Sequence, residues 1–176
     1  MKINLRTYNI FKKINKDPEY IYDNPNIWKD RGFVQVAVTK SVDGLSLSDK
    51  SFQDDKEIVL ASVGKFGVTL AHASKRLQDD EEVVLAAVRK NGMALAAASD
   101  RLKNDFKIVV NAAKQNGMAI QYASEELRNS IQVVFVAIRE NPEAIKFIGE
   151  ELKKDKQVMD VLNRKLEEDY KIKTNR

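Results

Sequence analysis

Apolar residues recur along this chain with a fixed period of 25 residues. Each period opens on a residue that caps helices well, and these residues are Asp30, Asp55, Asp80, Asp105, Ser130 and Asp155. They delimit five full units, at residues 30–54, 55–79, 80–104, 105–129 and 130–154. The fourth, fifth, ninth, sixteenth and twenty-third places of a unit are apolar; in 80–104 they hold Val83, Val84, Val88, Leu95 and Leu102. Self-similarity at a fixed period predicts a repeat architecture.

Each unit is predicted to hold two short helices joined by a tight turn. The residues on either side of Asn91-Gly92 follow the i, i+3, i+4 spacing of helices, as Val84 and Val88 illustrate. This spacing excludes the β-hairpin that an Asn-Gly pair often marks, because a hairpin needs strict alternation. The opening Asp is expected to cap the first helix. A left-handed glycine is expected to end that helix, and the candidates are Gly67, Gly92 and Gly117.

Small side chains predict close packing between the helices. The eighth place holds Ala37, Ser62, Ala87, Ala112 and Ala137, and the nineteenth holds Ser48, Ala73, Ala98, Ala123 and Ile148. We expect these positions to let the two helices of a unit cross closely, with the second helix burying places sixteen, nineteen, twenty and twenty-three. Two such short helices cannot form a core alone, so the units must stack. The predicted fold class is all-α: an α-solenoid of 25-residue helix-turn-helix repeats, about five to six units, with a C-terminal capping helix.

The pattern D-x-x-VVLAAV-x-x-NG-x-AL-x-x-AS-x-x-L-x-x-D of residues 80–105 resembles the repeat of the DUF4116 family, a domain of unknown function. The resemblance covers about residues 30–154 and is strongest over 80–129. It implies a helical repeat without assigned catalytic residues. Unit 30–54 departs from the pattern, because Val42 stands at the turn and Gly44 follows two residues later. Its second helix is therefore expected to be irregular.

The two ends of the chain differ from the units. Residues 1–29 are basic and concentrate aromatic side chains, namely Tyr8, Phe11, Tyr20, Tyr22 and Trp28. They are expected to form a cap or a degenerate repeat, with an aromatic and basic binding surface as the alternative. Residues 155–176 carry a narrow apolar stripe, which predicts a capping helix and a frayed tail; the stripe is Val158, Val161, Leu162 and Leu166.

The residues that would carry catalysis are scarce. The chain has no cysteine and one histidine, His72, which occupies a place that is mostly apolar in the other units. A lone titratable group without a placed partner is not an active site. The acid pairs Asp54–Asp55 and Asp79–Asp80 lack the spacing of a calcium loop, and no glycine-rich phosphate loop is present. The expectation is a protein that is not an enzyme and binds no metal or cofactor.

Charge and hydropathy bear on partners and location. The net charge is +4, with +3 in residues 1–29, while residues 30–154 hold 18 basic and 18 acidic side chains. A neutral middle gives little support to nucleic-acid binding. No signal peptide and no apolar run of about 20 residues is seen, so we expect a cytoplasmic protein, or one delivered into a host cell.

The leading functional hypothesis is a non-enzymatic scaffold that binds a macromolecule, foremost a protein, as an adaptor or as a pathogen or phage inhibitor. On an ideal second helix, places fourteen and eighteen would face away from the core. The predicted partner-binding ridge, which would also permit a homo-oligomer, is Val68, His72, Met93, Met118, Tyr122 and Phe147. The competing explanations are that the N-terminal segment covers this ridge or that the helix phase is off by one residue.

The alternative hypothesis is a nucleic-acid or ribonucleoprotein binder. It would use the basic N-terminal arm and the basic residues at the ends of the first helices. These residues are Lys12, Lys13, Arg89, Lys90, Lys114 and Arg139.

Overall fold

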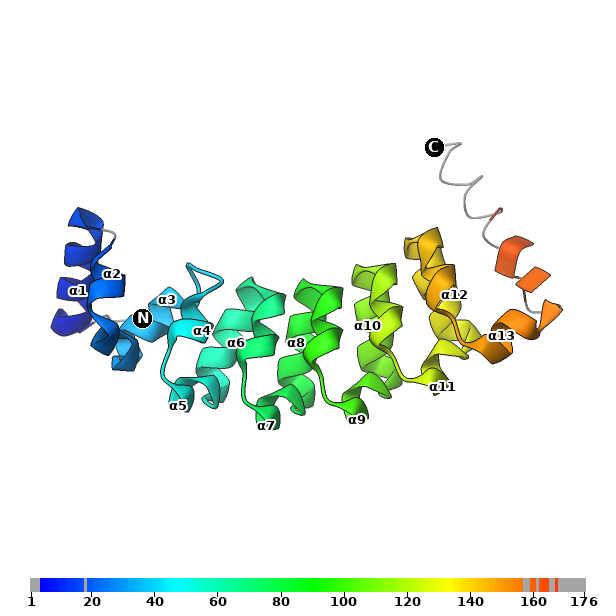
Figure 1. Cartoon of the computed structure of the whole chain (residues 1–176), viewed down its shortest axis with the longest axis horizontal. Coiled ribbons are helices and arrows are strands. Elements are labelled where there is room, and N and C mark those ends of the chain that lie inside the picture. The colour runs from blue at the N-terminus through cyan, green and yellow to red at the C-terminus, as the bar shows by residue number, and fades with distance from the viewer. Residues whose placement is uncertain (1–3, 18, 157–158, 161, 165–166, 168–176) are drawn as a thin grey trace.

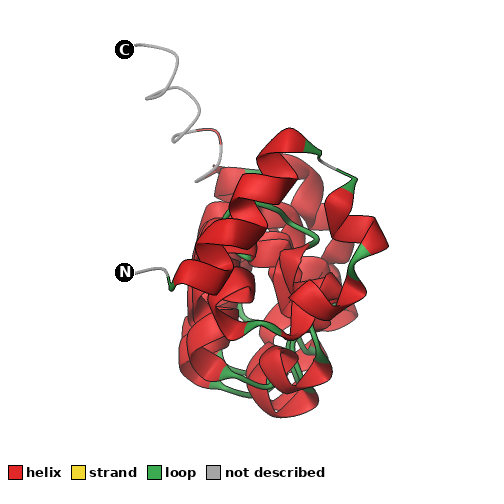
Figure 2. Ribbon diagram, turned by 90° about the vertical axis from the view of Figure 1, so that its left-hand side faces the viewer, coloured by secondary structure: helices red, strands yellow, loops and turns green. Residues whose placement is uncertain are grey.

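The computed structural model describes residues 4–17, 19–156, 159–160, 162–164 and 167 of the 176-residue chain. All the regular structure in this part of the chain is helical, and it contains no strand. The all-α class predicted from the sequence is confirmed. In Figure 1 the helices follow one another in chain order along the long axis of the molecule. Seen from the N-terminal end, the successive helices lie largely behind one another (Figure 2).

The first helix of each unit lies where the periodicity predicts it. These helices are α3 (Arg31–Ala37), α6 (Lys56–Lys65), α8 (Glu81–Lys90), α10 (Phe106–Gln115) and α12 (Ile131–Glu140). The side chains of Asp30, Asp55, Asp80 and Asp105 cap the first four; Asp105, for example, accepts the Ile108 N–H at 2.9 Å. Ser130 makes no such bond with its side chain. Helix α6 packs on α8, α8 on α10 and α10 on α12.

The prediction of a single second helix in each unit is wrong. A six-residue 3-10 helix follows the first helix, and these are η2 (Gly67–His72), η3 (Gly92–Ala97), η4 (Gly117–Tyr122) and η5 (Pro142–Phe147). A short α-helix comes next, and these are α7 (Lys75–Gln78), α9 (Asp100–Lys103), α11 (Glu125–Arg128) and α13 (Glu150–Lys154). An extended residue separates the two, such as Ala98 with φ −67° and ψ 157°. The place-twenty serine then caps the short helix, so Ser99 is half-buried rather than a core residue.

Unit 30–54 is irregular, as expected from Val42 and Gly44. After α3 the chain turns and forms α4 (Gly44–Leu47), a four-residue α-helix in place of the 3-10 helix. The short helix α5 (Lys50–Gln53) completes the unit.

The glycines that end the first helices are not left-handed, which corrects the prediction. No described residue has a positive φ. A Cβ on Gly92 would instead lie far inside the 3.0 Å that real Cβ contacts respect, against the carbonyl oxygen of Ala112 in the next unit. Gly67 and Gly117 face Ala87 and Ala137 in the same way. Glycine is therefore required by the close approach of the following unit.

The ends of the chain pack differently from its middle. Helices α1 (Leu5–Lys16), α2 (Tyr20–Asp23) and η1 (Pro25–Lys29) precede α3. The rings of Phe11 and Trp28 lie 5.3 and 5.1 Å from the ring of Phe33 in α3, whereas Tyr8 is exposed. Near the C-terminus Leu162 is buried. The predictions for Val158, Val161 and Leu166 fall outside the described residues.

Candidate interaction surfaces

A ladder of backbone hydrogen bonds joins each unit to the preceding one. The place-twenty N–H donates to the place-twenty-four carbonyl of the unit before, as Ser99 does to Gln78 at 2.9 Å. The same bond joins Ser74 to Gln53 at 2.8 Å, Ser124 to Lys103 at 3.0 Å and Gly149 to Arg128 at 2.8 Å. The recurrence of this bond every 25 residues keeps adjacent units in the same register.

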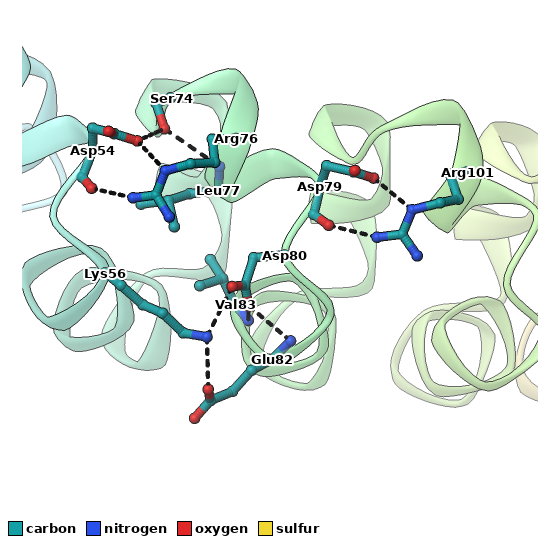
Figure 3. A network of polar contacts seen from close by, with 10 residues as sticks. All are labelled: Asp54, Lys56, Ser74, Arg76, Leu77, Asp79, Asp80, Glu82, Val83 and Arg101. Atoms are coloured by element: carbon teal, nitrogen blue, oxygen red, sulfur yellow. Dashed lines mark hydrogen bonds and ion pairs between the residues drawn. The ribbon is translucent and has the colours of Figure 1, made fainter.

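The aspartates at the ends of units 30–54 and 55–79 hold the next unit by their side chains (Figure 3). Asp79 accepts hydrogen bonds from the Ser99 hydroxyl and from Nε of Arg101, the latter at 3.0 Å. Asp54 accepts the equivalent bonds from Ser74 and Arg76. The serine hydroxyl is the main cause that lowers the pKa of both carboxyl groups. These carboxylates therefore stabilise the contact between units. Among the described residues, no group of three or more His, Asp or Glu side chains is placed to hold a metal ion.

A second set of ion pairs links the N-terminal ends of successive first helices. Lys56 Nζ lies 2.8 Å from a carboxylate oxygen of Asp80 and 2.9 Å from one of Glu82 (Figure 3). Burial acts to raise the pKa of Asp80, but Lys56 and the Val83 amide lower it overall. The same two carboxylates raise the pKa of Lys56. The pairing is reversed in the next unit, where Lys107 is the cation and lies 2.8 Å from Glu81.

Sequence differences between units are compensated in these contacts. Where earlier units have an aspartate, unit 80–104 ends on Asn104, and its side-chain oxygen accepts from the hydroxyl of Ser124. Where they have an arginine, the following unit has Glu126, and the Asn104 amide donates to it at 3.2 Å. In the earlier units the arginine of the following unit donates to the aspartate, whereas here Asn104 donates to the glutamate of the following unit. The contact between units is therefore kept.

The place-twenty-four side chain has a structural role that the sequence analysis missed. Gln78 is buried, and its amide nitrogen lies 3.2 Å from the carbonyl oxygen of Leu70, 3.3 Å from that of Ala71 and 3.1 Å from that of Ala73. The Leu70 carbonyl also accepts the Ala73 N–H, so the amide of Gln78 serves chiefly the Ala71 and Ala73 carbonyls, which the end of η2 leaves without helical partners. Gln53 makes the same three bonds in the preceding unit. The signal in the sequence is a long donor side chain at this place in every unit.

The residues of the predicted ridge lie on the row of 3-10 helices. Their rotation around the helix axis differs from that expected for an α-helix. Helix η2 packs on η3, η3 on η4 and η4 on η5, so equivalent places line up along the stack. A 3-10 helix has three residues per turn, and place fourteen therefore aligns with place seventeen rather than eighteen. Val68 and His72 are exposed. The other four ridge residues are half-buried, namely Met93, Met118, Tyr122 and Phe147.

An open groove lies between the row of 3-10 helices and the row of short helices, where two units carry an alanine at place seventeen. Ala71 and Ala96, together with Ala97, line this groove, whose volume is about 500 Å³. The side chains of Lys75, Gln78 and Lys103 contribute to the same groove. Its openness suits contact with a macromolecule better than enclosure of a small molecule.

The basic residues of the nucleic-acid hypothesis are exposed at helix ends. Arg89, Lys90, Lys114 and Arg139 lie in the last turns of α8, α10 and α12. Lys12 and Lys13 are exposed near the end of α1, and Nζ of Lys13 lies 5.2 Å from the centre of the Tyr20 ring. No helix in the described ranges is long and apolar enough to span a bilayer.

Comparison with known proteins identifies one family. Residues 55–100 and 80–128 match the model of the domain of unknown function DUF4116. The resemblance predicted from the sequence is therefore confirmed over these residues. Neither the curated proteins nor the solved structures contain a match.

Proposed function

We propose that this chain, whose residues 55–128 carry the DUF4116 repeat, is a non-enzymatic α-solenoid scaffold that binds a protein partner along its row of 3-10 helices. Each unit from 55–79 to 130–154 contributes a ten-residue helix, a 3-10 helix and a short α-helix to the solenoid, and the irregular unit 30–54 contributes three α-helices. The scaffold would act as an adaptor, or as an inhibitor that occludes its target.

The contacts between units support the solenoid. The backbone bond from Ser99 to Gln78 and the approach of Gly92 to Ala112 both recur in neighbouring units with the same 25-residue spacing. A structure in which each repeat contacts its neighbours in sequence order buries a continuous core. Pro142 replaces the glycine in unit 130–154. In the three preceding units a carbonyl oxygen of the following unit lies against the glycine at this place. The proline ring would occupy that space, so unit 130–154 is suited to a position with no further unit stacked on it.

The exposed side chains of the 3-10 row support protein binding. Val68 has 45% of its surface exposed, and His72 lies exposed on the same helix. Met93 and Met118 continue the row at the place equivalent to Val68. Met93 and Met118 are half-buried, so the row presents one exposed apolar side chain and two partly exposed ones. Apolar side chains that gather at a surface are typical of contact sites, and methionine adapts to varied partner shapes. The hydrogen bonds between units hold this row rigid, which reduces the entropy lost on binding.

The test is affinity capture with a ridge variant and a matched control. Val68→Asp with His72→Asp places two acidic side chains on the 3-10 row without touching the core. Phe106→Asp with Ile131→Asp is the control, because each of these side chains is 47% exposed on the ten-residue helices. Circular dichroism verifies that both variants keep the helical content of the wild type.

The ridge variant is expected to lose the protein that the wild type captures, and the control is expected to retain it. Retention by both variants would contradict the proposed surface. Loss by the control alone would assign binding to the face of the ten-residue helices instead.

A further inference from the structure

The C-terminal ends of the ten-residue helices share one edge of the molecule. Each of these helices begins shortly after a short helix ends, as α8 does at Glu81 after α7 ends at Gln78. The short helices α5, α7, α9 and α11 run along the lower edge in Figure 1. Ten helical residues span about 15 Å. The last turns of α6, α8, α10 and α12 therefore lie on the opposite edge.

This opposite edge is strongly basic. Places ten and eleven of the five units carry one acidic side chain, Glu140, and six basic ones. We call these six residues the basic edge: Lys40, Lys65, Arg89, Lys90, Lys114 and Arg139. All six are exposed. The first three places of the units, at the other end of the same helices, carry seven acidic and three basic side chains. The neutral total of residues 30–154 thus conceals a separation of charge across the width of the stack.

The cations of the basic edge have no acidic partners among the described residues. The ion pairs that join units lie at the other end of the helices or on the short helices, as in Lys56–Asp80 and Arg76–Asp54. On the basic edge itself, Arg89 donates to the Asn111 amide oxygen at 3.3 Å. A helix C-terminus carries about −0.5 charge, so five helices offset about −2.5. The side chains of the edge sum to +5, and a positive potential remains.

Helix α1 extends the same edge. The Thr7 hydroxyl donates to Asp30 at 3.1 Å and Arg6 lies 3.3 Å from the same carboxylate, so the N-terminal ends of α1 and α3 meet. The packing of Phe11 on Phe33 shows that the two helices run in the same direction. The last turns of α1, with Lys12, Lys13 and Lys16, therefore continue the row of cations.

We propose that the basic edge docks the phosphate backbone of a nucleic-acid duplex, without reading its sequence. Units that stack at about 10 Å intervals place the cations from Lys40 to Arg139 along about 40 Å, a little more than one turn of B-form DNA. Places ten and eleven hold no aromatic side chain, so a single strand would find no platform on which to stack its bases. Lysine and arginine that contact phosphates give affinity without sequence information. This surface is separate from the 3-10 row proposed to bind protein.

The test measures binding of a fluorescent 30-base-pair duplex to the full chain over a range of salt concentrations. The edge variant combines Lys65→Gln, Lys90→Gln, Lys114→Gln and Arg139→Gln. The control variant removes the same charge from the short helices, through Lys50→Gln, Lys75→Gln, Lys103→Gln and Lys153→Gln. Six phosphate contacts, one for each cation of the basic edge, predict a slope of log K against log salt of about −5.4 for the wild type.

In the edge variant Lys40 and Arg89 remain, so the slope is expected to weaken to about −1.8, and affinity at 0.1 M salt to fall by at least 100-fold. The control variant is expected to keep most of the salt slope and most of the affinity. Two duplexes of unrelated sequence should bind the wild type equally. Equal losses in the two variants, or a wild-type slope near zero, would overturn the proposal. Tighter binding of a single strand, or of polyglutamate, would replace the duplex as the ligand. The edge variant should still capture the protein partner, so the two surfaces can fail independently.

Discussion

The Cα atom of Gly92 faces the carbonyl oxygen of Ala112 in the following unit, and a methyl group there would displace one backbone from the other. Because Gly92 has no positive φ, alanine would bring no backbone strain of its own. We therefore expect Gly92→Ala to lower the free energy of unfolding through overpacking alone, by about 1–3 kcal/mol. Urea titration followed by circular dichroism measures this change.

Gly64 provides the matched control, because a Cβ at this position would meet no atom within 4 Å. It lies exposed inside helix α6, where alanine is favoured over glycine. Gly64→Ala is expected to raise the free energy of unfolding by about 0.5–1 kcal/mol. Equal effects of the two substitutions would show that the contact between units does not determine the choice of glycine at position 92.

The positions of these glycines could be predicted from the sequence, but the reason for them could not. A glycine after a helical pattern indicates a left-handed C-terminal cap in most helices. In this chain helix α8 instead ends at Lys90, and the next residue, Asn91, is extended with φ −151° and accepts the Met93 N–H with its side chain at 3.0 Å. The constraint on Gly92 comes from an atom 20 residues away, and a local pattern does not contain it.

Among the elements, the 3-10 helices depend on a side chain from the short helix that follows. Gln78 donates to the carbonyl oxygens of Leu70 and Ala71 in η2 and to that of Ala73, which follows this helix. Gln78→Leu keeps the apolar stem and removes the donors, which leaves the Ala71 and Ala73 carbonyls unpaired and should lower the free energy of unfolding by about 1–3 kcal/mol. Gln78→Lys should lose less than half as much. Urea titration of both variants gives the comparison.

The expectation for lysine rests on the last unit, where Lys153 occupies the equivalent place and its Nζ lies 3.3 Å from the carbonyl oxygen of Lys146. A lysine at this place can therefore reach the same end of the 3-10 helix. If the leucine and lysine variants unfold at the same urea concentration, the side chain acts by packing and not by donating hydrogen bonds.

The ten-residue helices were predictable because their caps and apolar spacing are local. The division of the second half of each unit was not, since the run from Ala94 to Ala98 favours a continuous helix. In the structure the Ser99 N–H donates to the Gln78 carbonyl of the preceding unit, so it cannot take part in a helical bond at that point. A hydrogen bond between units thus overrides the local preference, and it also changes the phase of the ridge residues.

At the scale of the whole molecule, charge is distributed by place within the unit. The sum over residues 30–154 is zero, and a sum along the chain therefore hides both the basic edge and the acidic ends of the same helices. Adding charges place by place across the five units reveals both. The sequence analysis names four residues of this edge, Arg89, Lys90, Lys114 and Arg139, as nucleic-acid candidates, but not Lys40 and Lys65. These two share the place of Lys90 and emerge only when charges are added place by place.

The stacking also determines which whole units can be removed. Deleting 55–79 or 80–104 takes out 25 residues and leaves the repeat in register. Deletion of 55–79 brings Asp54 opposite Arg101 and Arg31 opposite Asp80. These opposite charges reproduce the native pairs Asp54–Arg76 and Arg31–Asp55.

Deletion of 80–104 instead brings Asp79 opposite Glu126, so the native attraction Asp79–Arg101 becomes a repulsion. Lys56 keeps an aspartate partner, Asp105 in place of Asp80, but Lys107 replaces its second partner, Glu82. We expect both shortened chains to stay helical, but the chain without 80–104 should melt at the lower temperature by circular dichroism. Because these groups are exposed, 1 M salt should screen the repulsion and bring the two melting temperatures together. Equal melting temperatures at low salt, or a difference that persists at 1 M, would mean that packing rather than charge determines which units fit side by side.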